Sequence, residues 1–395
     1  MRILYLADIR FPLDRANGIQ TMETCYALVE RGHDVRLLVR PDTASQPRDP
    51  FDFYGLAHHA GLRIERVPVG GSESLRRLTY VAGAVGAVMG ARGQVDVVLT
   101  RDLTVAGLVA RIPRALRPPL VYESHGLAPV FAQTQPEMIS GGAVAPQAKV
   151  RRLAAREAIV WRRTEGYVTI TSGLADDLVQ HFGPRRNMAT VPDGARLLAS
   201  RSYTPPRATL SPLVVYAGHL YPWKGVDVLL RALVHLPAVK AVIAGGHPAE
   251  GDLQRLKGLA ALLCLDDRVT FTGFISRAEV AALLQTADVL VMPHTATAVS
   301  ERYASPLKLF EYMVAGKPIV ASDLAAVREV LRDDENACLV KPGDARALAA
   351  GIARAAGDRA VAERIARHAF DEAASFTWAR RAERLESVLL EAARA

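Results

Sequence analysis

Residues 305–323 read SPLKLFEYMVAGKPIVASD, and this stretch decides the fold because it joins an amphipathic helix to a buried strand. Leu307, Phe310 and Met313 recur at helical spacing, and Gly316 then marks the end of the helix. The apolar run that follows is short and β-branched, as in a strand covered on both faces. A helix that leads directly into such a strand is typical of α/β folds.

The start of this helix has the features of an anion-binding site. Ser305 is a favourable N-cap, and Pro306 suits the first helical position. The free backbone N–H groups and the partial positive charge there suit a diphosphate. Glu311, farther along the helix, can accept hydrogen bonds from a ribose diol. The alternative is an ordinary capped helix with a solvated glutamate.

Outward from this block, short apolar runs alternate with helical stretches in both halves of the chain. The predicted strands are residues 2–7, 34–40, 62–69, 95–100, 119–124 and 167–171, then 213–218, 239–246, 268–273, 287–293, 317–323 and 335–343. Helices are expected at residues 19–31, 105–112 and 378–393. This alternation predicts two parallel sheets with right-handed crossovers.

The length of 395 residues exceeds what one hydrophobic core usually serves. Residues 200–212, SRSYTPPRATLSP, are rich in Pro, Ser and Thr and are typical of an interdomain linker. We therefore expect an α/β protein of two doubly wound, Rossmann-like domains that face each other across a cleft. The predicted division is a first domain at residues 1–203, a linker at 204–212, a second domain at 213–375 and a C-terminal helix at 376–395 that packs back toward the first domain.

Composition indicates which cellular compartment and which charged partners to expect for the protein. The three cysteines, Cys25, Cys264 and Cys338, lie far apart without metal-ligand spacing, which favours a reducing cytoplasm. The first residues resemble a buried strand rather than a signal peptide. Up to Arg201 there are 26 Lys and Arg against 19 Asp and Glu, so the first half is expected to meet something anionic. Because the basic residues have no interleaved aromatics, nucleic acid is not expected.

A basic helix and a polar loop are also predicted in the first half. Cations crowd one predicted helix at Lys149, Arg151, Arg152, Arg156, Arg162 and Arg163. Peripheral contact with an anionic membrane is one interpretation of this helix, and a solvated face is the other. Residues 131–147 are expected to form a mobile loop over the cleft.

Several common catalytic motifs are missing from the sequence. Neither half has G-x-G-x-x-G after its first strand, and no P-loop or G-x-S-x-G motif occurs. No D-x-D motif stands in a suitable loop to hold a metal ion. We therefore expect no cofactor and no metal.

The chain resembles the retaining GT-B glycosyltransferases of family four along nearly its whole length. The similar segments are SPLKLFEYMVAG, YAGHLYPWKGVDVLLRAL, VTFTGFISRAEVAALLQTADVLVMP, VPDGARL and ANGIQTMETCYALVERGHDV. Their shared order over most of the chain makes the resemblance specific. It implies transfer of a sugar from a nucleotide-diphosphate donor to an acceptor that the sequence does not identify, with front-face attack and no metal.

The resemblance also implies roles for individual residues. Lys224 would neutralise the donor diphosphate, and Glu311 would hold the ribose. The backbone N–H groups of Leu307 and Lys308 would meet the phosphates. The remaining implied donor-binding residues are Gly18, Gly218, His219, Phe274, Ser305 and Pro306.

On the acceptor side, His125 matches a family histidine that faces the transferred sugar, and Glu123 precedes it at the same strand end. Two positions depart from the family pattern. His219 stands where the family has arginine, and Tyr303 stands where it has the first glutamate of a pair. Glu301, two residues away, is the candidate substitute for a sugar contact. Alternatives are a nucleotide-sugar epimerase, an inverting transferase, or a non-catalytic protein of the same fold.

Overall fold

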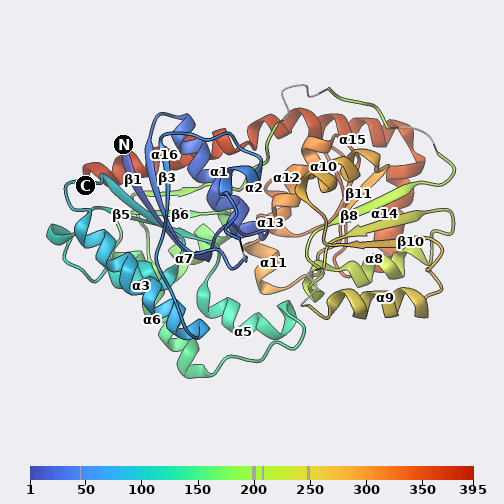
Figure 1. The fold of residues 1–395 in the computed structure, drawn as a ribbon. Helices are drawn as coiled ribbons and strands as arrows, with labels where there is room; N and C mark the ends of the chain where they lie inside the picture. Colours follow the sequence, from blue (N-terminus) through green and yellow to red (C-terminus); the bar gives the residue numbers. More distant parts are fainter. Residues whose placement is uncertain (45, 198–201, 207–208, 247–249) are drawn as a thin grey trace.

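The computed structural model describes residues 1–44, 46–197, 202–206, 209–246 and 250–395, and it places two sheets side by side (Figure 1). The first sheet is parallel throughout, in the order β3-β2-β1-β4-β5-β6-β7. Its strands are β1 (Arg2–Arg10), β2 (Asp34–Arg40), β3 (Leu62–Arg66), β4 (Val97–Thr100), β5 (Leu120–Ser124), β6 (Gly166–Thr169) and β7 (Met188–Thr190).

The second sheet is also parallel throughout, in the order β10-β9-β8-β11-β12-β13. Its strands are β8 (Leu213–Ala217), β9 (Lys240–Ala244), β10 (Val269–Gly273), β11 (Val289–Met292), β12 (Ile319–Ser322) and β13 (Cys338–Val340). In each sheet the strand order reverses between two central strands, β1 and β4 in the first and β8 and β11 in the second. Ligands of such sheets bind at the carboxyl ends of these strands. The predicted doubly wound architecture is confirmed.

Helices cover the sheets of both halves. Those of the first half are α1 (Ala16–Glu30), α2 (Pro50–Tyr54), α3 (Glu73–Gly90), α4 (Leu103–Val109), α5 (Ala128–Met138), α6 (Gln147–Arg163) and α7 (Ser172–Phe182). The second half has α8 (Val226–Leu233), α9 (Asp252–Leu262), α10 (Arg277–Thr286), α11 (Ala298–Arg302), α12 (Leu307–Ala315), α13 (Ala325–Arg328), α14 (Ala345–Gly357), α15 (Arg359–Glu372) and α16 (Trp378–Arg394). Short 3₁₀ turns are η1 (Arg114–Leu116), η2 (Pro222–Lys224) and η3 (Ala373–Ser375).

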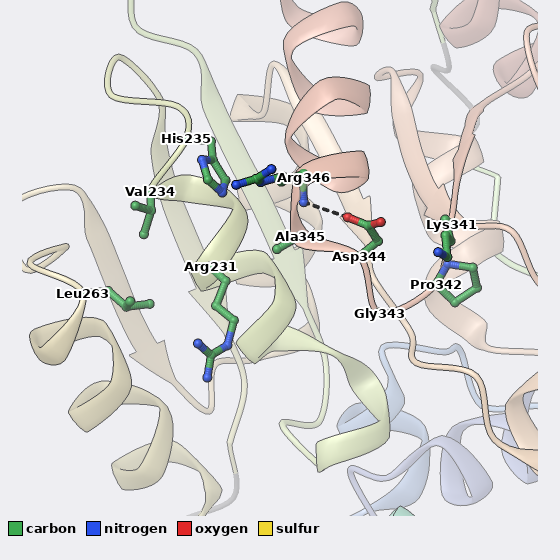
Figure 2. A pocket seen from close by; sticks show the side chains of 10 residues that line it. All are labelled: Arg231, Val234, His235, Leu263, Lys341, Pro342, Gly343, Asp344, Ala345 and Arg346. Atoms are coloured by element: carbon green, nitrogen blue, oxygen red, sulfur yellow. Dashed lines mark hydrogen bonds between the residues drawn. The ribbon is translucent and has the colours of Figure 1, made fainter.

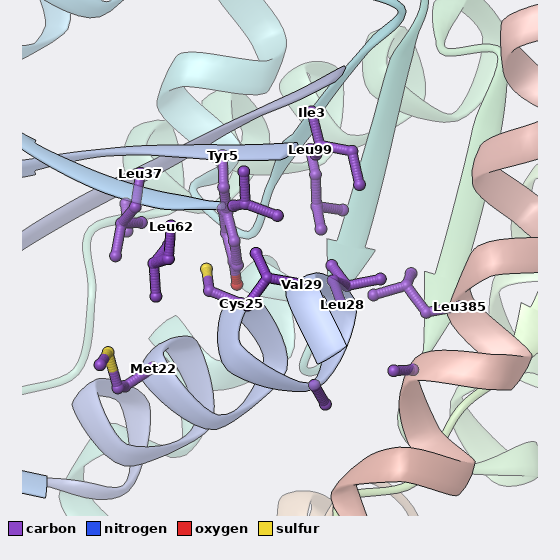
Figure 3. Close-up of a cluster of buried hydrophobic side chains, with 14 of the residues drawn as sticks. Ile3, Tyr5, Met22, Cys25, Leu28, Val29, Leu37, Leu62, Leu99 and Leu385 are labelled. Carbon is purple, nitrogen blue, oxygen red and sulfur yellow. The ribbon is translucent and has the colours of Figure 1, made fainter. Parts of the chain in front are cut away.

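The last helix, α16, returns from the second half and packs on the first sheet and α1 (Figure 1). Figure 3 shows Leu385 of α16 beside Leu28 of α1, in the cluster that also buries Tyr5 and Leu37. Burying each large aliphatic side chain contributes roughly 1.5–3 kcal/mol, so this contact holds the C-terminus firmly to the first half. The predicted linker at residues 204–212 lies partly outside the described residues.

The expectation of a loop at residues 131–147 was wrong for its first part, because α5 occupies residues up to Met138. This helix contacts η2 and α11 of the second half. Just beyond α5, the Ser140 hydroxyl donates a hydrogen bond to Asp252 Oδ1 at 2.7 Å. A segment of the first domain therefore spans to the second domain beside the predicted phosphate lysine.

Candidate active site

Three side chains converge where β8 and β11 end, at the reversal point of the second sheet. Gly218 follows β8 with φ +138°, and a Cβ there would lie 2.6 Å from the Lys308 Nζ atom. The Lys308 ammonium also lies 3.8 Å from the centre of the Tyr216 ring. Across the site, the Lys224 Nζ atom lies 3.5 Å from the centre of the Trp223 ring. His294, which follows β11, packs its ring 5.2 Å from that of Trp223.

The turn that carries Lys224 is held against the end of β11 by close backbone contacts. Gly225 has φ +69°, and a Cβ there would lie 1.8 Å from the Pro293 carbonyl oxygen, so only glycine fits. The Thr295 N–H donates to the carbonyl of Trp223 at 3.0 Å. These contacts fix the lysine at the tip of the sheet.

Burial lowers the pKa of Lys224, Lys308 and His294. Desolvation lowers the pKa of Lys224 to about 7. The pKa of Lys308 falls well below its ordinary value through burial first and repulsion from Lys224 second. His294 behaves in the same way, with burial first and then both lysines lowering its pKa. A bound anion would favour the protonated form of all three side chains.

His219, the candidate phosphate ligand in the glycine loop, is engaged elsewhere. Its ring stacks on Tyr221 with 5.0 Å between centroids, and its Nδ1 atom lies 3.7 Å from Glu250 Oε2. Glu250 also accepts hydrogen bonds from Tyr221 and, across the domains, from Arg15. Burial first, and repulsion from Lys224 and Arg15, lower the pKa of His219 to about 4. His219 is therefore neutral near pH 7.

The predicted ribose ligand lies one helical turn from the cation pocket. Burial raises the pKa of Glu311, while Arg277 and Lys308 act in the opposite direction. Arg277 donates to Glu23 of α1 at 3.2 Å, so an interdomain ion pair borders this carboxyl group. Phe274, directly after β10, is 51% exposed.

The acceptor-side candidates form a buried ion network at the end of β5. His125 Nε2 lies 2.7 Å from Glu123 Oε1. Glu123 is fully buried, and Arg381 of α16 donates to both of its carboxylate oxygens at 2.7 Å. Burial alone would raise the pKa of Glu123, but Arg381 and His125 hold it well below its usual range. Burial first, and then Arg101, lower the pKa of His125 to about 4.

Two expectations about the start of α12 were wrong. The helix begins at Leu307, with Pro306 in the N-cap position and no side-chain cap. Ser305 instead accepts a hydrogen bond from the Asp193 N–H at 3.1 Å. This contact with the loop after β7 turns the Ser305 side chain away from the helix, so the first free amides begin at Leu307.

The side chains of Glu301 and Tyr303 are not brought to the cation pocket. The Tyr303 hydroxyl donates to Asp177 of α7 at 2.7 Å, beside the Arg302–Asp177 ion pair. Glu301 accepts from the backbone N–H of Ala325. These contacts hold the end of α11 against α7 and the start of α13. Gly18 lies in the first turn of α1, and a Cβ there would lie 2.3 Å from the Leu13 carbonyl oxygen.

Other features lie outside this site. Figure 2 shows a hollow on the second domain lined by Arg231, His235 and Arg346, among others, which contains none of the predicted site residues. Within the described residues, the three metal-ligating side chains that lie close enough to share an ion are Asp49, Asp52 and His58, all exposed, at the start of α2 and just beyond it. None of the described helices combines the length and the apolar character that a membrane crossing requires.

Three residues that the structure places with the candidate site residues were not predicted from the sequence, namely His294, Arg381 and Asp193. A signal existed for His294, because a polar residue directly after a buried central strand faces the ligand edge of the sheet. No local pattern connects Arg381 to Glu123, which is 258 residues away in sequence.

Known proteins match both halves of the chain. The model of "Glycosyl transferases group 1" matches residues 205–374, and that of the "Glycosyl transferase 4-like domain" matches residues 18–194. A D-inositol 3-phosphate glycosyltransferase of Xylanimonas cellulosilytica is 28% identical over 88% of this chain and 86% of its own length. An alpha-D-kanosaminyltransferase of Streptomyces kanamyceticus is 30% identical over 36% of each chain.

Solved structures agree on the fold. A sucrose-phosphate synthase of Thermosynechococcus elongatus superposes with a TM-score of 0.77 at 20% identity, over 99% of this chain and 98% of that one. Anabaena HepE, crystallised with UDP-glucose, superposes with a TM-score of 0.73 at 21% identity over 99% of both chains. The two family models cover both domains, and these structures share their arrangement. The chain therefore belongs to the group 1 glycosyltransferases, enzymes with the GT-B fold of two facing Rossmann-like domains.

Proposed function

We propose that this enzyme transfers a sugar, with retention at the anomeric carbon, from a nucleotide-diphosphate donor to a glycan, glycolipid or small-molecule acceptor. The observation that carries the proposal is the pocket of Lys224, Lys308 and His294 at the β8/β11 reversal point. The HepE structures with UDP and UDP-glucose support a nucleotide-sugar donor. The sequence resemblance supports retention.

Each group has a distinct task in this reaction. The diphosphate gains negative charge as its bond to the sugar breaks, and buried cations stabilise that charge most at this moment. Lys224, Lys308 and the amide groups at the start of α12 would supply this stabilisation. The acceptor attacks from the same face, and its proton passes to the leaving phosphate oxygen. His125, held by Glu123, would orient a sugar hydroxyl.

A binding and hydrolysis screen over UDP-, GDP-, ADP- and dTDP-sugars tests the function. We expect one nucleotide to bind, and Lys224→Ala to weaken that binding at least tenfold, because a charge-assisted hydrogen bond contributes roughly 1.5–3 kcal/mol. Lys257→Ala, which removes an exposed lysine of α9, is the matched control. Equal affinity of Lys224→Ala and wild type for every nucleotide would remove Lys224 from the site.

The transferase is expected to work without a metal ion, because lysines and helix amides can supply the positive charge. With a donor and acceptor in hand, turnover in excess EDTA should match turnover in magnesium. Loss of most activity in EDTA, restored by magnesium, would contradict this proposal.

We also propose a cytoplasmic enzyme that rests on anionic membrane through α6. Its cations Lys149, Arg151, Arg152, Arg162 and Arg163 are exposed, whereas its only acid, Glu157, is buried and accepts from the Ala128 N–H at 2.9 Å. Helix α3, which contacts α4 as α6 does, exposes the apolar side chains of Leu75 and Leu78. Each cation near an anionic surface contributes on the order of 1 kcal/mol.

Sedimentation with phosphatidylserine-containing vesicles at physiological salt checks the membrane contact. Wild type should bind, and Arg151→Gln/Arg152→Gln should bind less. Arg359→Gln/Arg364→Gln on α15 removes the same charge from another surface and should bind like wild type. Absence of wild-type binding, or equal loss in both double variants, would favour a solvated face.

A further inference from the structure

The ring of His294 is completely buried, yet within the described residues neither of its nitrogens has a hydrogen-bond partner. An unpartnered buried polar group is costly, because it has lost its hydrogen bonds to water without replacing them. Native proteins seldom keep such a group unless a ligand or water completes it. The position of His294 at the β8/β11 reversal point favours a ligand.

The groups that face His294 define the chemistry of that ligand. The charges that act on its ring are the ammonium groups of Lys224 and Lys308. Trp223 packs against the ring from η2. The acidic group that acts on these side chains is Glu311. It raises the pKa of Lys308 and is not among the charges that shift the pKa of His294. In the described part of the chain, the Lys308 ammonium also has no hydrogen-bond partner. Two buried ammonium groups beside the unpartnered nitrogens of His294 fit an anion that carries several oxygens.

His219 does not fill this role, because its ring stacks on Tyr221 and its Nδ1 atom faces Glu250, whereas the His294 nitrogens are unpartnered in the described part of the chain. We propose that His294 is the third cationic ligand of the donor diphosphate, taking up one proton from solvent as the nucleotide binds and donating hydrogen bonds to the phosphate oxygens. This inference rests on the proposed function and deepens it. It makes the donor site of this enzyme a Lys-Lys-His site.

The charges around His294 determine whether protons are taken up when the nucleotide binds. In the empty pocket, burial and two neighbouring ammonium groups keep the His294 ring neutral. A bound diphosphate brings negative charge that outweighs this repulsion, which raises the pKa of His294 in the complex. Binding therefore takes up protons, and affinity falls as the pH rises above that pKa. Lys224, with its pKa near 7 in the empty site, adds a fractional proton of its own.

Calorimetry with the nucleoside diphosphate that binds wild type measures this directly. The binding enthalpy at pH 7.5 is compared between two buffers of different ionisation enthalpy, which gives the number of protons taken up. We expect His294→Phe to lower the uptake and to weaken binding about ten- to hundredfold. His294→Asn should recover part of the affinity through its amide but not the proton uptake.

His235→Phe is the matched control, because His235 is an exposed histidine at the hollow of the second domain (Figure 2). It should bind and take up protons like wild type. If His294→Phe does not fold, His294→Asn carries the test alone. Wild-type affinity and uptake in the folded His294 variants would overturn the inference while the proposed function stands. Failure of wild type to bind any nucleoside diphosphate would overturn both.

Discussion

Arg381→Met is expected to lower the free energy of unfolding by about 3–5 kcal/mol, because it leaves the buried carboxylate of Glu123 without its main cation. Both side chains are almost fully buried, and Arg381 also donates to the Val191 carbonyl at 3.0 Å. Methionine keeps most of the side-chain volume, so the loss is mainly electrostatic. Chemical denaturation, compared at equal m-values, measures the change.

The neighbouring Arg380 supplies the control, since it pairs with Glu383 on the exposed face of the same helix. Exposed pairs contribute about 0–1 kcal/mol, so Arg380→Met should leave stability nearly unchanged. In the double variant Glu123→Gln/Arg381→Met the unpaired charge is gone, and part of the stability should return. If Arg381→Met were no worse than Arg380→Met, the buried pair would not exist as described.

This ion pair also connects α16 to the candidate site residues His125 and Glu123. Glu123 contacts both Arg381 and the His125 ring, so the last helix of the chain holds the carboxylate that orients this histidine. Arg381 is a positioning residue in this arrangement. The helix therefore follows the second domain in sequence, packs on the first domain and holds the end of β5.

The alternation of strands and helices could be predicted because its cause is local. Buried parallel strands need continuous apolar runs, and those runs appear in the sequence at the predicted places. The three-residue strand β7 was missed, since a short, half-buried edge strand has no such pattern. Helix α5 was taken for a loop because it contains Pro136 and has little apolar periodicity. Its contacts with η2 and α11 override that weak local preference.

The residues of the candidate site also differ in whether local or distant contacts determine their placement. Lys224 and Glu311 were proposed from motifs, and their placement depends on one turn and one helix. The side-chain direction of Tyr303 depends on Asp177, which lies in the other domain. Spacing along the chain gives the position of Tyr303 but cannot give that direction. The same holds for Arg381, whose partner lies on β5.

Glu311→Gln is expected to lower kcat/KM for the natural donor about ten- to hundredfold, because charged hydrogen bonds to a diol contribute roughly 1.5–3 kcal/mol. Glutamine keeps the shape of the side chain, and among the described residues no cap or ion pair of α12 uses Glu311. Initial rates with the natural donor and with its 2′,3′-dideoxyribose analogue separate binding from folding. The exposed Glu391→Gln on α16 serves as the control and should behave like wild type.

The comparison between the two donors distinguishes a lost ribose contact from a damaged site. A variant that has lost only its contact with the ribose should use the dideoxy donor as well as wild type does, since neither protein has a diol to hold. A damaged pocket would instead slow both donors equally, because Lys308 and Arg277 lie beside Glu311 and would be disturbed with it. If Glu311→Gln used the natural donor like wild type, α12 would not carry the ribose. The placement of the diphosphate at the start of the same helix would then fall as well.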